Sequence, residues 1–136
     1  MKGAEPDRWL MDTGSGHDLI SDHDIPDWNR ENMMEMCPRP GELHTANGVT
    51  LVINQVSMQI VNLKDDATAL VLESTPAVLS ISARCMEKGW SFEWMAGKEP
   101  TMTSPSGHKI QLRLIRNVPY LVERLPAKSC QPTSSV

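Results

Sequence analysis

Short apolar runs, separated by glycine, proline and asparagine, dominate the pattern of this chain. Apolar and polar residues alternate in the second half of segment 51–63 and in segment 110–114, which is typical of half-buried strands. Shorter apolar runs predict strands at residues 9–11, 69–72, 91–94 and 118–122. Because Pro119 lacks the N–H that a ladder needs, we expect the last of these to be an edge strand.

Segment 78–88 has a helical spacing of apolar residues, and Gly89 is placed to end that helix. Its expected apolar face consists of one row with Val78, Ile81 and Cys85 and a second row with Leu79, Ser82 and Met86. Segment 25–41 contains three prolines and a glycine, so we expect an irregular loop, with at most a short helical turn at 31–36 that lines a pocket. The expected fold is mainly β with one short helix.

The length of 136 residues indicates one domain, which we place at residues 1–125. Residues 126–136 are rich in Ser, Pro and Thr and are expected to form a flexible C-terminal tail. The net charge of −4, with no basic stripe, argues against a nucleic-acid partner. No apolar run approaches the roughly 20 residues of a membrane span, so we expect no membrane partner and a soluble, cytoplasmic protein.

The three cysteines, Cys37, Cys85 and Cys130, are odd in number and far apart. This pattern favours free thiols in a reducing compartment over a disulfide framework or a zinc site. A cysteine nucleophile acting with His44 or His108 has no supporting local motif. His17, Asp22, His23 and Asp24 are irregularly spaced, which favours a polar loop over a metal site. Trp28 and Trp94 are expected to be packing residues rather than platforms for a substrate.

Asn47-Gly48 is the strongest turn signal in the chain, since both residues suit the positive φ angles of a type I′ turn. A hairpin centred there would place Thr45 opposite Thr50 and Ala46 opposite Val49. An ordinary surface hairpin has the same pattern. The predicted hairpin becomes informative about function because an apolar-Asp-Thr-Gly element precedes it in the chain.

That element is Asp12-Thr13-Gly14-Ser15, which directly follows the apolar residues 9–11. An acid at the end of an apolar strand is either part of a turn or a carboxylate held where water is scarce. The second arrangement is the one that makes a carboxylate useful in catalysis.

Residues 10–15 resemble the active-site motif of aspartic proteases, and the single motif in a short chain resembles the retropepsins of retroviruses and retrotransposons. The fit is closer to the Copia-type polyproteins, which have an aromatic residue before the motif, as Trp9 is here. Their Thr-Ala-Asn/Asp-Gly flap is matched by residues 45–48. Their Leu-Leu-Ser-Val-Ser…Lys-Gly helix is matched by residues 78–82 and 88–89, so the resemblance covers residues 9–121.

The resemblance implies a retropepsin-like closed β-barrel, the acid protease fold, in a homodimeric aspartic endopeptidase that needs no metal or cofactor. Asp12 would be catalytic, Thr13 would hydrogen-bond across the dimer axis, Gly14 would allow a close backbone approach, and the Ser15 hydroxyl would reach the carboxylates. Residues 110–121 would supply the sheet of the dimer. Retroviral members have Gly at the position of Ser80, and Copia-type sequences tolerate Ser there. The flap, which would close over a peptide or polyprotein substrate, comprises Thr45, Ala46, Asn47, Gly48 and Val49.

The chemistry itself requires two carboxylates, one to take a proton from water and one to protonate the scissile carbonyl oxygen. Two like charges about 3 Å apart cannot both ionise, so the pair shares one proton. No other acid in this chain is followed by Thr/Ser-Gly, so a second Asp12 must come from a twofold partner. Two alternatives remain: an inactive retropepsin-fold module for dimerisation or peptide binding, and a monomeric β-barrel binding domain with an accidental Asp-Thr-Gly.

Overall fold

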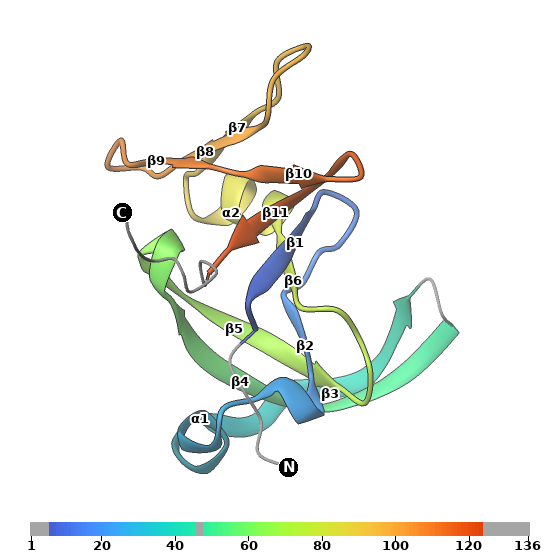
Figure 1. Cartoon of the computed structure of the whole chain (residues 1–136). Coiled ribbons are helices and arrows are strands. Elements are labelled where there is room, and N and C mark those ends of the chain that lie inside the picture. Colours follow the sequence, from blue (N-terminus) through green and yellow to red (C-terminus); the bar gives the residue numbers. More distant parts are fainter. Residues whose placement is uncertain (1–5, 46–47, 124–136) are drawn as a thin grey trace, which may run out of the picture.

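The structure is a computed structural model that describes residues 6–45 and 48–123. It is mainly β, with an eight-stranded mixed sheet in the order β10-β11-β1-β6-β2-β5-β4-β3 and a three-stranded sheet in the order β7-β8-β9 (Figure 1). The elements are β1 (Arg8–Asp12), β2 (Leu19–Ser21), η1 (Asp22–Asp24), α1 (Asp27–Asn32), β3 (Met34–Thr45), β4 (Gly48–Ile60), η2 (Val61–Leu63), β5 (Asp65–Leu72), β6 (Val78–Ser80), α2 (Ile81–Glu87), β7 (Ser91–Glu93), β8 (Thr101–Thr103), β9 (Lys109–Gln111), β10 (Arg113–Ile115) and β11 (Val118–Val122).

Strand β1 lies inside the larger sheet, between β11 and β6. Its side chains alternate between the two faces of the sheet, as the period of a strand requires. Trp9 and Met11 are buried in the main core. Leu10 packs against a second apolar cluster that contains Leu19 and Val78. This alternation directs Asp12 to the same face as Leu10.

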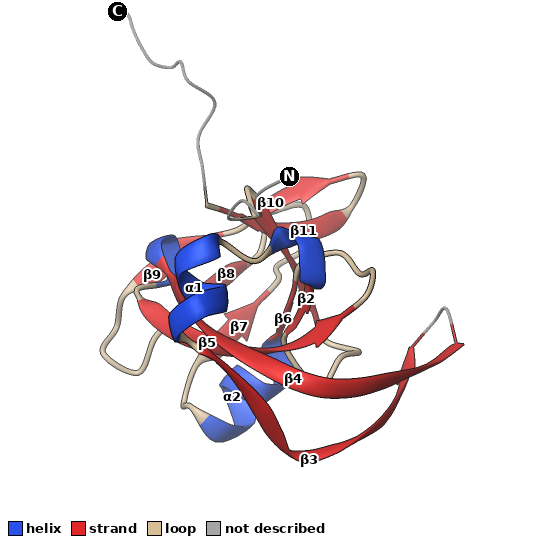
Figure 2. Cartoon of the chain, turned by 90° about the horizontal axis from the view of Figure 1, so that it is seen from below, coloured by secondary structure: helices blue, strands red, loops and turns tan. Residues whose placement is uncertain are grey.

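The strand order is open, with β10 and β3 at the two edges, whereas the sequence analysis expected a closed barrel. The long β3–β4 hairpin runs out beyond the other strands (Figure 2). None of the helices in the described ranges is long and apolar enough to cross a membrane. The tail expected at residues 126–136 lies outside the described residues.

The predicted strands at 9–11, 69–72 and 118–122 are confirmed, but the predicted edge position of the last is wrong. Strand β11 lies between β10 and β1. Its pairs with β1 run from Arg8↔Val122 to Leu10↔Tyr120 and stop before Pro119. The missing N–H of Pro119 therefore interrupts no pair on that side.

Segment 78–88 is not one helix, because its first three residues form β6 beside β1. Ser80 ends the strand and caps α2, accepting a hydrogen bond on Oγ from the Ala83 N–H at 3.0 Å. Gly89 ends the helical region with a φ of 77°, as expected. The expected apolar face is wrong at Met86, which is 83% exposed, whereas Arg84 is buried.

Segment 25–41 is not an irregular loop, since it contains α1 and the first half of β3. The described residues therefore hold two α-helices instead of the single one expected. Pro38 and Pro40 are compatible with β3 because it is an edge strand whose register shifts between Met36 and Gly41. Met36 in this strand is 67% exposed.

The predicted hairpin is present as β3 and β4, but its register differs from the expected one. Thr45 pairs with Gly48, not Thr50, and His44 pairs with Val49. Gly48 has a φ of 116° and takes part in the last pair itself, so it is not one of two unpaired turn residues. The Thr45 hydroxyl donates to the Gly48 carbonyl oxygen at 3.0 Å. Ala46 and Asn47 lie outside the described residues.

Candidate active site

Asp12 ends β1 and pairs in register with Ser80 of the parallel strand β6. Its Oδ1 accepts a hydrogen bond from the Gly14 N–H at 2.7 Å, which folds the chain back tightly after the strand. A Cβ atom at Gly14 would lie 3.2 Å from that same oxygen. A side chain at Gly14 would therefore crowd the Asp12 carboxylate. This steric limit explains why the motif has a glycine at this position.

A cleft of about 710 Å³ opens over Asp12. The structure brings together there six of the residues that the sequence singled out, namely Asp12, Gly14, Ser15, Thr45, Gly48 and Val49. Thr13 does not line this cleft but a second hollow that Asp12 shares. The apolar walls come from residues that the sequence analysis did not name as site residues: Leu10, Leu19, Leu43, Leu72 and Val78.

Ser15 is held within its own loop. Its hydroxyl donates to the His17 carbonyl oxygen at 2.6 Å and accepts from the His17 N–H at 3.3 Å. The loop from Thr13 to His17 is largely exposed in the single chain. A carboxylate beside such a loop is shielded from water only when another molecule covers it.

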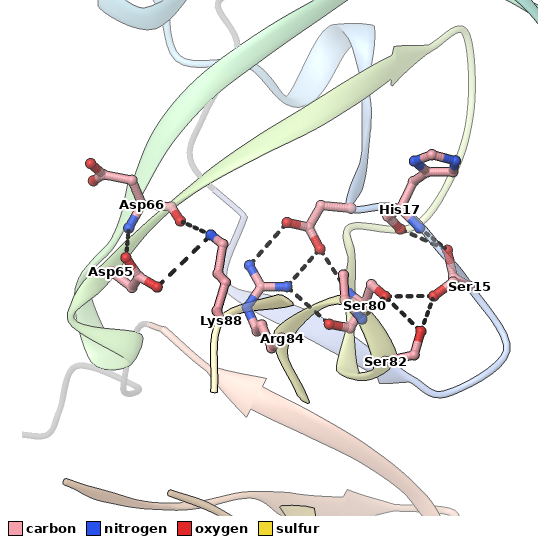
Figure 3. Close-up of polar contacts among 10 residues, drawn as sticks. Ser15, His17, Asp65, Asp66, Ser80, Ser82, Arg84 and Lys88 are labelled. Atoms are coloured by element: carbon pink, nitrogen blue, oxygen red, sulfur yellow. Dashed lines mark hydrogen bonds and ion pairs between the residues drawn. The ribbon is translucent and has the colours of Figure 1, made fainter. Parts of the chain in front are cut away.

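Ser80 connects the Asp12 loop to α2 (Figure 3). Its buried hydroxyl donates to the Ser15 carbonyl oxygen at 2.6 Å while it caps the helix. Ser82 reaches the same carbonyl oxygen at the longer distance of 3.3 Å. Ser80 therefore makes a polar connection between the Asp12 loop and α2.

Ser80→Ala is expected to lower the free energy of unfolding by about 1–2 kcal/mol, because it removes both the cap and the hydrogen bond to Ser15. Urea denaturation followed by circular dichroism measures the loss. Ser82→Ala is the matched control and should cost less, since its bond to Ser15 is long and it does not cap the helix. Equal losses in the two variants would contradict the connecting role of Ser80.

The sequence analysis missed an ion pair behind this loop. Arg84 donates from its two terminal nitrogens to the Asp18 carboxylate at 2.7 and 2.9 Å, and Asp18 Oδ1 also accepts from the Ser80 N–H at 2.7 Å. The Arg84 side chain is 1% exposed and that of Asp18 10% exposed. Asp18 thus holds the β6–α2 junction against the chain that follows the Asp12 loop. The only signal in the sequence was a cation between the apolar positions Ile81 and Cys85.

The two tryptophans considered in the sequence analysis do not line the cleft. Trp28 and Trp94, which were expected to be packing residues, are 63% and 48% exposed, and Trp94 meets Phe92 edge to face. Both lie on surface segments, α1 and the loop after β7. Within residues 6–45 and 48–123, no three His, Cys, Asp or Glu side chains gather so as to hold a metal ion.

Cys37 is a buried free thiol in the apolar cluster beneath the cleft. Burial, together with the Glu35 carboxylate, raises the pKa of this thiol above its ordinary value because both disfavour the thiolate. We expect iodoacetamide to alkylate Cys37 more slowly in the native chain than in the unfolded chain at the same pH. Mass spectrometry after timed labelling measures the rates, and equal rates would contradict a buried thiol.

The raised pKa of Cys37 makes the free energy of unfolding depend on pH. The native thiol keeps its proton to higher pH than the unfolded one. Its contribution to the free energy of unfolding is therefore complete below the ordinary thiol pKa. It is lost as pH rises from there through the raised pKa. The wild type should therefore lose stability over this range relative to Cys37→Ala, as urea denaturation at a series of pH values would measure.

No protein-family model matches this chain, and no curated protein matches its sequence. The inference about function therefore depends on the residues of the cleft and on their chemistry.

Proposed function

We propose that the protein is a homodimeric aspartic endopeptidase of the retropepsin type, derived from a retrotransposon polyprotein. The observation that carries the proposal is the position of Asp12 at the end of β1, in a cleft that the β3–β4 hairpin also lines. The motif residues and the hairpin residues, far apart in the chain, line the same cleft.

In this mechanism the two Asp12 residues of a dimer share one proton. The ionised carboxylate takes a proton from a water molecule whose oxygen attacks the scissile carbonyl carbon. The protonated carboxylate gives its proton to the carbonyl oxygen. The tetrahedral intermediate then collapses, the C–N bond breaks and the leaving nitrogen takes up a proton. No covalent enzyme intermediate forms, so no nucleophilic side chain is required.

The neighbouring residues hold this pair in place. The Gly14 N–H fixes one Asp12 oxygen, and Ser80 fixes the loop through the Ser15 carbonyl group. Thr13, which does not face the cleft, is free to bond across the twofold axis. The hairpin, with Thr45, Gly48 and Val49 at its described end, would close over the substrate and exclude water from the dyad.

The proposed substrate is an extended peptide, such as a junction between polyprotein domains. An extended chain can pair with the backbone of the hairpin, and its apolar side chains can enter the space between Leu10, Leu43 and Val78.

The alternative, an inactive peptide-binding module, is less well supported. Two facing carboxylates would destabilise a dimer that made no use of them. The test is cleavage of a peptide library between pH 4 and 7 at several protein concentrations. A dimeric protease gives activity that rises faster than linearly with protein, while a dimer that cleaves nothing favours the binding module.

A further inference from the structure

The loop between β5 and β6, residues 73–77, forms part of the cleft wall and is anchored at both ends. The buried Ser21 hydroxyl donates to the Glu73 carbonyl oxygen at 3.1 Å, and the Leu10 N–H donates to the Ala77 carbonyl oxygen at 2.8 Å. Residues 73–76 of this loop line the cleft. Because the backbone is fixed at its first residue, the Glu73 side chain starts from a defined position in the cleft wall.

Glu73 gives the cleft a second acid besides Asp12. The described residues that line the cleft include His17 and His44 but neither Lys nor Arg. Imidazole groups carry little charge at pH 7, whereas carboxylates are ionised, so the cleft is negative at that pH. The exposed Glu73 carboxylate makes no hydrogen bond or ion pair within residues 6–45 and 48–123. An ionised group in this position attracts a cation from outside the chain.

Glu73 lines the cleft far from Asp12, because the strands that carry these two residues run in opposite directions. Strand β1 is parallel to β6, β6 is antiparallel to β2, and β2 is parallel to β5. Strand β5 is therefore antiparallel to β1, and Glu73 follows the end of β5 while Asp12 ends β1. Three strand spacings of about 4.8 Å and roughly five residues of about 3.3 Å separate them by on the order of 20 Å. An extended peptide spans this distance in about six residues, and in fewer when a long side chain covers part of it.

We propose that Glu73 selects peptide substrates that carry a Lys or Arg side chain roughly three to five residues from the scissile bond. The inference rests on the proposed function, in which an extended peptide lies along the cleft with its scissile bond at Asp12. The basic side chain forms an ion pair with the Glu73 carboxylate, and an acidic side chain in its place is repelled. Because each protomer of the dimer contributes a Glu73, a basic residue is favoured on either side of the bond.

The test compares peptides that differ at one of these positions. In a peptide that the wild type cleaves at pH 7, each position in turn is made Lys, Gln or Glu. At the best position, kcat/KM for the Lys peptide should exceed that for the Gln peptide by about three- to fivefold, the effect of an exposed ion pair, and the Glu peptide should be cleaved more slowly still. Glu73→Gln should abolish the difference between the Lys and Gln peptides, and Glu73→Lys should reverse the order of the Lys and Glu peptides.

Glu31→Gln is the matched control, because it removes an exposed carboxylate on α1 that does not line the cleft. It should keep the wild-type preference for Lys. Equal kcat/KM values for the three wild-type substrates, or a Lys preference that Glu73→Gln retains, would overturn the role of Glu73 and leave the protease function standing.

A binding measurement separates the selection of peptides from their cleavage. Fluorescence anisotropy at pH 7 gives the dissociation constants of labelled Lys and Gln peptides for the Asp12→Asn chain, with and without Glu73→Gln. The Lys peptide should bind about three- to fivefold more tightly unless Glu73 is replaced, and about 0.5 M NaCl should remove the difference. This preference in a protein whose wild type cleaves no peptide would support the role of Glu73 and overturn the protease function alone. Failure to bind either peptide would overturn both.

Discussion

Asp12→Asn is expected to abolish peptide cleavage, lowering kcat/KM by at least about 10³-fold. The substitution removes both carboxylates of the dimer at once, so neither a base for the water nor an acid for the carbonyl oxygen remains. The amide oxygen of Asn can still accept the hydrogen bond from the Gly14 N–H, so the loop should keep its conformation.

The measurement is a pH series with a peptide that the wild type cleaves, together with sedimentation of the variant. Asp66→Asn is the matched control, because Asp66 is an exposed acid on β5 that does not line the cleft. It should cleave at the wild-type rate. Cleavage by Asp12→Asn at the same rate would show that another residue or a contaminant acts. A variant that no longer dimerises would mean that Asp12 serves assembly as well as chemistry.

Arg84→Met is expected to lower the free energy of unfolding by about 3–5 kcal/mol, the largest stability effect that the structure predicts. Methionine keeps an unbranched side chain and a similar helix propensity but removes the charge. The Asp18 carboxylate would then lose two of its charge-assisted hydrogen bonds in a site that water barely reaches. The cost arises from this carboxylate, which is left without its cation.

Two comparisons make the test of Arg84 specific. The double variant Asp18→Asn/Arg84→Met removes both charges and should recover part of the loss. Arg30→Met removes the cation of the exposed pair with Asp22, and it should cost less than about 1 kcal/mol. Urea denaturation of all variants at one pH gives the values. A loss for Arg84→Met no larger than that for Arg30→Met would contradict a buried, stabilising pair.

The Nε atom of Arg84 has no hydrogen-bond partner among the described residues, although it is buried. Such a group lowers the net stabilisation by the ion pair. The pair is therefore better understood as a device that orients the β6–α2 junction than as a simple source of stability. Its effect on Asp12 passes through Ser80, whose N–H bonds to Asp18 and whose hydroxyl bonds to the catalytic loop.

Local features of the sequence were sufficient to predict the strand that ends at Asp12 and a hairpin near residues 45–48. Trp9, Leu10 and Met11 predict a short strand that ends at Asp12, while the structure shows which of them face the main core. The Asp-Thr-Gly turn depends on one hydrogen bond between neighbours in the chain. The hairpin, too, was marked by its turn residues, although its register was not.

Longer-range features could not be read from local patterns. Segment 78–88 has the spacing of a helix, yet pairing with β1 makes its first residues a strand. Pro119 suggested an edge strand, yet β11 lies inside the sheet because the pairs with β1 end before the proline. In each case a contact with a distant segment decided the outcome.

The sequence by itself therefore determined that this chain is mainly β and that one acid ends an apolar strand. Only the tertiary structure decided that the hairpin lines the same cleft as that acid, that Arg84 is buried against Asp18, and that an apolar hollow lies beside Thr13. The physical reason is that periodicity and turn preferences act between neighbouring residues, whereas strand order and the burial of a charge depend on which distant segments meet.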